Sequence, residues 1–177
     1  MTIPITSLTE QFQIAYLVVT GPLNSGKSTF IQTINGMGLS AGLDLIAPKP
    51  NLEMSQIAIP NDGVLQVVTT PESRRFDYMW EILPYILGFI VMMDSATPET
   101  FFEARSVLEI FRWYSPASYV VAANKQDFSD AWSPDDLRIA LRIPNDIPVV
   151  SCVATDKESV KNVLLALLTR VLEEIDD

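Results

Sequence analysis

The chain has 177 residues, of which 48% are hydrophobic and 19% are charged, and its net charge is −10. This length fits one compact domain, and the acidic balance disfavours nucleic acid and anionic membranes, which both bind basic surfaces. The absence of histidine excludes Ser-His-Asp and Cys-His triads and histidine metal sites, and the single cysteine, Cys152, excludes an internal disulfide. These features predict a cytoplasmic protein, because reduced thiols are usual there.

Targeting and lipidation motifs are not found, so no membrane anchor is expected. The first basic residue is Lys27, and the longest uncharged apolar run, residues 82–93, is too short to cross a bilayer. Residues 1–12 are predicted to be an N-terminal extension that precedes one domain over residues 13–177.

Strand patterns and helix patterns alternate along this domain. Apolar runs predict strands at residues 14–20, 54–59, 64–70, 88–93, 119–123 and 147–152. Residues 60–63 (Pro-Asn-Asp-Gly) predict a hairpin turn between the second and third of them. Helices are predicted at residues 27–35 and 99–113, after Ser133, and after Thr155, which has capping-box spacing to Glu158. The alternation predicts an α/β fold with a mainly parallel sheet, covered on both faces, and a ligand at the carboxyl ends of its strands.

A phosphate-binding loop is predicted immediately after the first strand. Residues 21–28 (GPLNSGKS) satisfy the pattern GxxxxGK[ST], in which glycines let successive backbone N–H groups curl around an anion at a helix N-terminus. In this pattern Lys27 adds a positive charge for the β- and γ-phosphates, Ser28 offers a hydroxyl to Mg²⁺, and Thr29 reaches the α-phosphate. The predicted phosphate-binding residues are Gly21, Asn24, Ser25, Gly26, Lys27, Ser28 and Thr29.

A base-reading motif is predicted about one hundred residues later, where residues 124–127 (NKQD) follow another apolar strand. The Asp127 carboxylate can accept two hydrogen bonds from guanine, at ring N1–H and at the exocyclic amine, whereas adenine offers no such donors at that edge. An unmatched carboxylate costs a few kcal/mol, so Asp127 favours guanine. The aliphatic stem of Lys125 can lie over the base, and Asn124 can brace the phosphate loop.

Together these motifs resemble those of the Ras-like small GTPases, over residues 14–175. The resemblance implies a P-loop NTPase fold with a six-stranded sheet in the order 2-3-1-4-5-6, strand 2 antiparallel, and it implies GTP or GDP with Mg²⁺ as ligands. It also implies that Val153, Ala154 and Thr155 support the guanine. Only Ala154 matches the family's usual Ser-Ala-Lys, so the implied contact is the Ala154 backbone N–H to the guanine oxygen.

A closer similarity links the chain to the bacterial branch of these GTPases, which includes gliding-motility polarity switches and relatives paired with Roadblock-type regulators. It rests on residues 75–83 (RFDYMWEIL), 122–127 (AANKQD) and 158–161 (ESVK). The similarity implies a Roadblock-type regulator protein as a partner.

The switch regions depart from the family pattern. Thr69 stands where eukaryotic relatives have an Asp that holds Mg²⁺ through water, Glu72 replaces a Gly that senses the γ-phosphate, and Ser73 replaces the Gln that orients water. A carboxylate at position 72, about 5 Å from the phosphates, would repel them by roughly 3 kcal/mol per unit charge. Alignment of the first switch points to Asn51 in place of the family Thr.

These replacements leave no residue assigned as catalytic and predict weak or absent GTP hydrolysis. The alternative is a pseudo-GTPase that acts as a binding module, in which nucleotide is structural or absent. A small P-loop kinase is disfavoured, because nothing in the sequence supplies its lid arginines. Arg74 and Arg75 are interpreted as exposed switch residues rather than an arginine finger. Side chains predicted to be core are Trp80, Phe101, Phe102, Phe111 and Trp113, and Cys152 is predicted to be a buried, inert thiol.

Overall fold

The computed structural model describes residues 14–39, 53–59, 63–70 and 82–176. Several predictions from the sequence lie outside these residues: the N-terminal extension 1–12, turn residues 60–62, and Asn51, Glu72, Ser73, Arg74, Arg75 and Trp80. The side chain of Phe111 is also outside the description.

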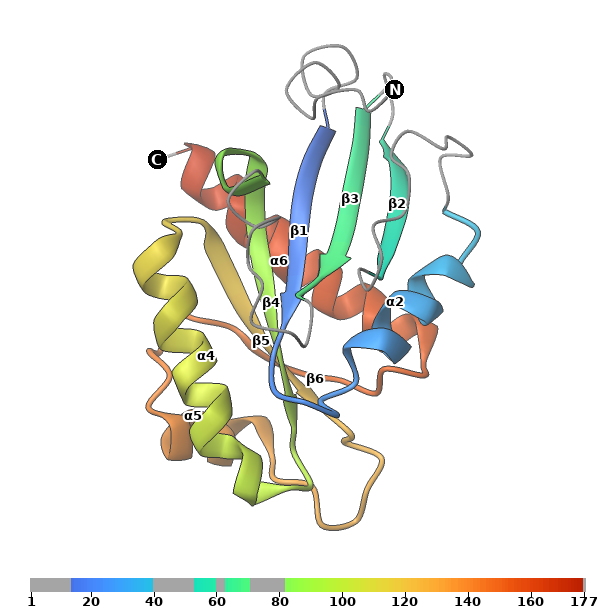
Figure 1. Ribbon diagram of the computed structural model, residues 1–177. Coiled ribbons are helices and arrows are strands. Elements are labelled where there is room, and N and C mark those ends of the chain that lie inside the picture. The colour runs from blue at the N-terminus through green and yellow to red at the C-terminus, as the bar shows by residue number, and fades with distance from the viewer. Residues whose placement is uncertain (1–13, 40–52, 60–62, 71–81, 177) are drawn as a thin grey trace.

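The described strands form one six-stranded sheet in the order β2-β3-β1-β4-β5-β6 (Figure 1). The strands are β1 (Ile14–Thr20), β2 (Met54–Ile59), β3 (Gly63–Thr69), β4 (Ile86–Asp94), β5 (Ser118–Asn124) and β6 (Val149–Ser151). All neighbours pair in parallel except β2, which runs antiparallel to β3. The predicted α/β class and strand order are confirmed.

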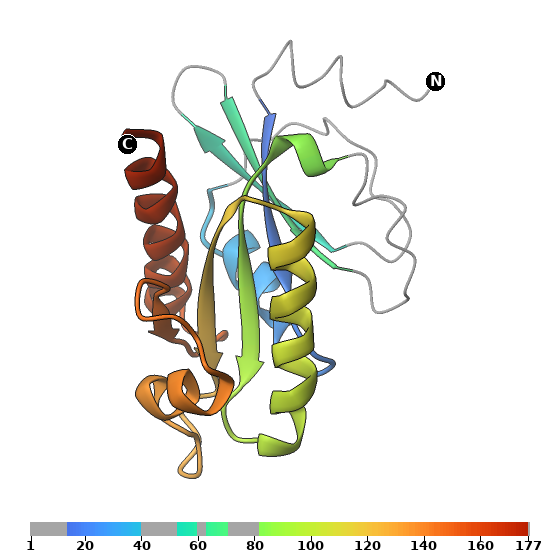
Figure 2. The ribbon, with the colours of Figure 1, turned by 90° about the vertical axis from the view of Figure 1, so that its left-hand side faces the viewer.

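Helices cover both faces of this sheet (Figure 2). Helices α2 (Lys27–Asn35) and α6 (Lys157–Asp176) pack on one face, and α4 (Phe101–Tyr114) and α5 (Pro134–Leu141) pack on the other. Two short 3-10 helices, η1 (Leu83–Tyr85) and η2 (Pro98–Thr100), flank β4. Successive side chains along the strands lie alternately in the two cores, as expected for a sheet buried on both sides.

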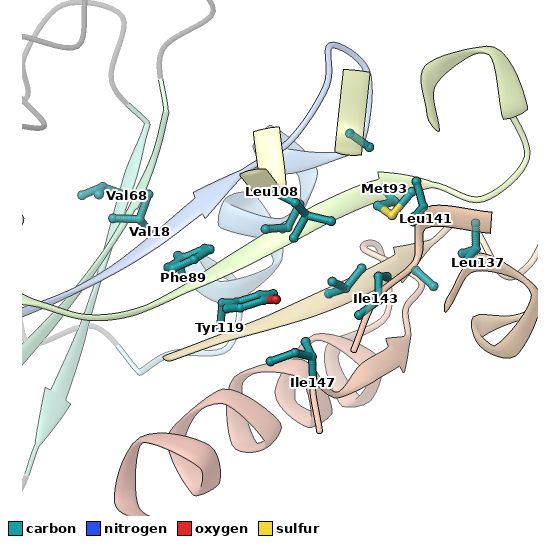
Figure 3. Packing of buried hydrophobic residues seen from close by; sticks show 14 of the residues in the cluster. Val18, Val68, Phe89, Met93, Leu108, Tyr119, Leu137, Leu141, Ile143 and Ile147 are labelled. Atoms are coloured by element: carbon teal, nitrogen blue, oxygen red, sulfur yellow. The ribbon is translucent and has the colours of Figure 1, made fainter. Parts of the chain in front are cut away.

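Aromatic and aliphatic side chains fill the core under α4 and α5 (Figure 3). The rings of Phe89 and Tyr119, on neighbouring strands, stack with their centroids 5.0 Å apart. Leu137 and Leu141 of α5 and Leu108 of α4 close this core from outside the sheet. Each such side chain contributes about 1.5–3 kcal/mol when fully buried, so the core holds the strand ends in fixed relative positions.

The beginning of α6 differs from the prediction. The N-cap is Asp156 rather than Thr155, because the Asp156 carboxylate accepts a hydrogen bond from the backbone N–H of Ser159 (2.8 Å). Asp at this position satisfies a helix N–H group and carries a favourable charge for the helix dipole. Thr155 is thereby left exposed in the loop that precedes the helix.

The aromatic residues of α4 also correct the prediction in part. Phe101 is buried, but Phe102 and Trp113 are 83% and 88% exposed and form no part of the core. Helical spacing alone predicted that these aromatic residues are core, whereas the helix contacts the sheet through Phe101, Ala104 and Leu108. Within the described ranges, no helix is both long and apolar enough to cross a bilayer.

Candidate functional site

The phosphate loop, residues 21–29, is shaped by backbone conformations that glycine favours. Gly21 and Gly26 have φ of +145° and +101°, and Asn24 between them has φ of +60°. A methyl group on Gly21 would run into the Met92 carbonyl oxygen, and one on Gly26 would run into the Asn124 amide nitrogen. The two glycines therefore permit both the curl of the loop and its close approach to β4 and β5.

Lys27 begins α2 at the end of this loop, so the loop leads directly into a helix N-terminus. The Lys27 ammonium donates hydrogen bonds to the carbonyl oxygens of Gly21 (3.0 Å) and Pro22 (2.8 Å). These bonds tie the lysine across the loop, where its charge adds to the positive end of the helix dipole. The arrangement is suited to an anionic group such as a phosphate.

Asn124, the last residue of β5, joins the phosphate loop to the opposite side of the site. Its buried amide nitrogen donates to the Ser25 carbonyl oxygen (2.9 Å), and its amide oxygen accepts from the Ala154 N–H (2.9 Å). The prediction that Asn124 braces the phosphate loop is confirmed. The family resemblance implies that the Ala154 N–H donates to the guanine oxygen. In the structure this N–H donates to the Asn124 amide oxygen instead.

The base loop, residues 124–128, is held by the neighbouring strand ends. The Gln126 N–H donates to the Cys152 carbonyl (3.2 Å), and the Cys152 N–H donates to the Ala123 carbonyl (2.9 Å). Lys125 adopts φ of +65°, and its ammonium donates to the carboxylate of Asp94 (2.6 Å). Asp127 is exposed and accepts no hydrogen bond from any residue of the described ranges.

The loop that contains residues 153–155 is fixed by two helices. The Val153 N–H donates to the Ser159 hydroxyl of α6 (2.8 Å), and the Thr33 hydroxyl of α2 donates to the Ala154 carbonyl (2.6 Å). Since Ala154 also binds Asn124, this loop, the phosphate loop and the base loop form one connected network.

These loops line one cavity of about 650 Å³, a size typical of small-molecule sites. Of the residues predicted to bind nucleotide, all except Gly21 and Ser25 line it. The lining residues are Asn24, Gly26, Lys27, Ser28, Thr29, Asn124, Lys125, Asp127, Phe128, Val153, Ala154 and Thr155. The loops lie beyond the carboxyl ends of β1, β5 and β6, at the lower end of the sheet in Figure 1. The sequence motifs, distant along the chain, therefore meet at one place.

Phe128 is the lining residue that the sequence analysis missed. The residue is 51% exposed, and the Lys125 ammonium lies 5.9 Å from the centroid of its ring. An aromatic residue adjacent in sequence to Asp127 was the available signal, because an exposed ring at a polar cavity offers a flat apolar surface.

Ser28, which the sequence predicts as the magnesium ligand, is exposed and lines the cavity. Mg²⁺ in phosphate sites is usually held by one or two side chains, waters and the phosphates, so this donor fits when a nucleotide supplies the rest. Thr69, at the end of β3, donates its hydroxyl to the Glu53 carbonyl (3.3 Å). Within the described part of the chain, no three acidic or cysteine side chains group as a metal site.

A buried thiol and a buried carboxyl next to the site have altered acidity. Burial raises the pKa of the Cys152 thiol to about 12, although a hydrogen bond involving Ser159 acts in the opposite direction. Burial also raises the pKa of the Asp94 carboxyl, but hydrogen bonds from Lys125, Thr97 and Ala96 outweigh it and leave this pKa below its ordinary value. Asp94 is therefore an anion at neutral pH, and Cys152 is a neutral thiol.

No protein-family model matches this sequence, and no curated protein matches it. The functional argument therefore rests on the residues of the cavity and their geometry.

Proposed function

We propose that the protein is a Ras-like small G protein with a P-loop NTPase fold, which binds GDP and GTP in the cavity between the phosphate loop and the base loop. The observation that carries this proposal is that one cavity contains both Lys27 with the curled phosphate loop and the open carboxylate of Asp127. The first group is suited to a diphosphate, and the second is suited to a ring with adjacent N–H donors.

The preference for guanine follows from hydrogen-bond matching at Asp127. Guanine offers N1–H and an exocyclic amine to the two carboxylate oxygens. Adenine presents a ring nitrogen lone pair at the equivalent edge, so it would cover the carboxylate without donating to it. A buried charged acceptor left unmatched costs about 1–3 kcal/mol or more, which corresponds to a preference of about 10- to 100-fold or more.

Mg²⁺ is part of the proposal, with Ser28 as its protein ligand. When bound, the ion would neutralise phosphate charge. The residues described in the cavity hold and orient the nucleotide, and none of them is assigned to activate water. Together with Glu72 and Ser73 in the second switch, this supports weak or absent GTP hydrolysis.

The alternative proposal is a pseudo-GTPase binding module in which nucleotide is structural or absent. It is favoured by Thr69, which stands where eukaryotic relatives have a metal-binding Asp and whose hydroxyl donates to the Glu53 carbonyl. A Roadblock-type regulator remains the partner proposed from the similarity of residues 75–83, 122–127 and 158–161. Single-turnover hydrolysis of GTP, with and without such a regulator, tests this alternative, because slow but measurable turnover or a large acceleration by the regulator would overturn the pseudo-GTPase proposal. Turnover near that of ordinary small GTPases would overturn both the pseudo-GTPase proposal and the expectation of weak hydrolysis.

Nucleotide binding itself is tested by titrating the purified, nucleotide-stripped chain with fluorescent GDP and fluorescent ADP in the presence of Mg²⁺. We expect GDP to bind at least about 10-fold more tightly than ADP. Equal affinities would remove the role of Asp127, and no binding of either nucleotide at millimolar concentration would overturn the proposal.

A further inference from the structure

Asp94 is a buried acid beside the cavity that is not among the cavity's lining residues. It is the last residue of β4 and pairs in register with Asn124 on β5. Its side chain is only 5% exposed, and its carboxylate accepts hydrogen bonds from the Ala96 N–H (3.0 Å), the Thr97 hydroxyl (2.9 Å) and the Lys125 ammonium (2.6 Å). Three donors around one carboxylate fix its position, and the shortest bond is the one to Lys125.

Lys125 therefore has its charged end held on the side of Asp94. Its side chain is 28% exposed and lines the cavity, while its ammonium is bonded to a carboxylate that is only 5% exposed. The next acid along the base loop is Asp127, only two residues away and exposed in the same cavity. Without Asp94, the flexible lysine chain and the Asp127 carboxylate would attract each other at close range.

We propose that Asp94 is a positioning residue for base recognition: by capturing the Lys125 ammonium, it keeps both Asp127 oxygens available to the base and holds the Lys125 stem as a wall of the cavity. This inference rests on the proposed function, because it concerns recognition of the base by the same site.

The consequence is a defined effect on base selectivity. A carboxylate with two open oxygens accepts both N1–H and the exocyclic amine of guanine. If Lys125 occupies one oxygen, only one hydrogen bond to the base remains. Inosine diphosphate has N1–H but lacks the exocyclic amine, so its binding depends less on the second oxygen. Releasing Lys125 is therefore expected to reduce the preference for GDP over inosine diphosphate.

The test variant is Asp94→Asn, which keeps the shape of the side chain and an oxygen acceptor for the Ala96 N–H but removes the charge that holds Lys125. The amide nitrogen replaces the oxygen that accepts from Thr97, and it can donate to the Thr97 hydroxyl instead. Competition against fluorescent GDP gives the affinities for GDP and inosine diphosphate. We expect GDP affinity to fall by about tenfold, the effect of one charged hydrogen bond, and the GDP preference to fall by at least about threefold. Because a new Lys125–Asp127 pair would be screened by salt, raising the ionic strength should restore part of the preference.

Two further variants distinguish a positioning role of Asp94 from a general disturbance of the turn at residues 94–97. Thr97→Val removes one hydrogen bond to Asp94 but leaves its pair with Lys125, so the GDP preference should stay at the wild-type value. In a Lys125→Met background, Asp94→Asn should cause no additional change in the preference, because no ammonium remains to be released. These variants keep the inference falsifiable even if Asp94→Asn lowers the melting temperature.

The inference is overturned if wild-type protein prefers GDP but Asp94→Asn leaves that preference unchanged. It is also overturned if Thr97→Val lowers the preference as much, or if Asp94→Asn lowers it further in the Lys125→Met background. Failure of wild-type protein to bind GDP at all would instead overturn the proposed function, so the two failures are distinguishable.

Discussion

The phosphate loop and the base loop build the two sides of the cavity in different ways. The phosphate loop depends on backbone conformation, with Gly21 and Gly26 at positive φ and Lys27 bonded to loop carbonyls. The base loop depends on side chains, with Asp94 anchoring Lys125 and Asp127 left open. Backbone N–H groups recognise a phosphate whatever base it carries, whereas a side-chain carboxylate recognises the base. Changes in the phosphate loop should weaken the binding of every nucleotide, and changes in the base loop should alter which nucleotide is preferred.

The largest effect is expected for Gly26→Ala. The added methyl group would run into the Asn124 amide, and the φ of +101° is strained for alanine. The distorted loop backbone and the loss of the Asn124–Ser25 hydrogen bond should together reduce the binding free energy by about 4 kcal/mol. This is a loss of about 1000-fold in affinity for GDP and ADP alike, which calorimetric titration measures. Gly38→Ala is the matched control: Gly38 also has positive φ (+71°), but a methyl group there meets nothing within 4 Å. A Gly26→Ala protein that keeps wild-type affinity would contradict the role of the loop backbone.

Asn124→Ala tests the connection between the two loops. The substitution leaves the Ser25 carbonyl and the Ala154 N–H without the partner they share. We expect the free energy of unfolding to fall by about 2–4 kcal/mol, measured by urea denaturation, and nucleotide affinity to fall with it. Unchanged stability together with unchanged affinity would show that the two loops are held independently of Asn124.

Asp127→Asn should change base preference while leaving the phosphate loop intact. The amide can still accept from N1–H, but its NH₂ group faces the exocyclic amine of guanine, so GDP affinity should fall by about 30-fold. Xanthosine diphosphate carries a carbonyl oxygen at that position and should gain affinity. ADP affinity should hardly change, because the phosphate loop is untouched. Equal losses for GDP and ADP would contradict the separation of roles between the loops.

The smallest expected effect is on the labelling rate of the Cys152 thiol, which reports how often the base loop opens. Cys152 lies under it, is buried, and has a pKa raised to about 12, so its thiol stays protonated at pH 8. Thiolate is the reactive form, so a disulfide reagent should label native protein slowly at pH 8, and labelling in urea should be fast. Prompt labelling of native protein would show that the base loop opens readily.

The sequence was sufficient to predict most of the fold because its apolar runs are bounded by clear turn residues. The bounds of β1, α2 and β2 agree with the prediction, and Ser133 caps α5 by accepting from the Asp136 N–H (3.2 Å). The N-cap of α6 was predicted one residue early, since Thr155 and Asp156 are both good caps and their choice depends on tertiary contacts.

Site residues were predictable where a sequence motif fixes their chemistry, and they were not predictable where tertiary packing determines their position. The residues around Lys27 and Asp127 are assigned by spacing, and they do line one cavity. The contact of Asp94 with Lys125 and the position of Phe128 at the cavity could not be predicted, because nothing in the local sequence shows that the end of β4 meets Lys125. The exposure of Phe102 and Trp113 likewise depends on which side of α4 faces the sheet.

The most direct test of the central claim is a crystal structure of the full chain with GDP and Mg²⁺. The account predicts the diphosphate within the phosphate loop and both Asp127 carboxylate oxygens about 2.7–3.2 Å from N1 and the exocyclic nitrogen of guanine, with the Lys125 ammonium still on Asp94. A base that points away from Asp127, or a cavity that stays empty at millimolar GDP, would contradict it.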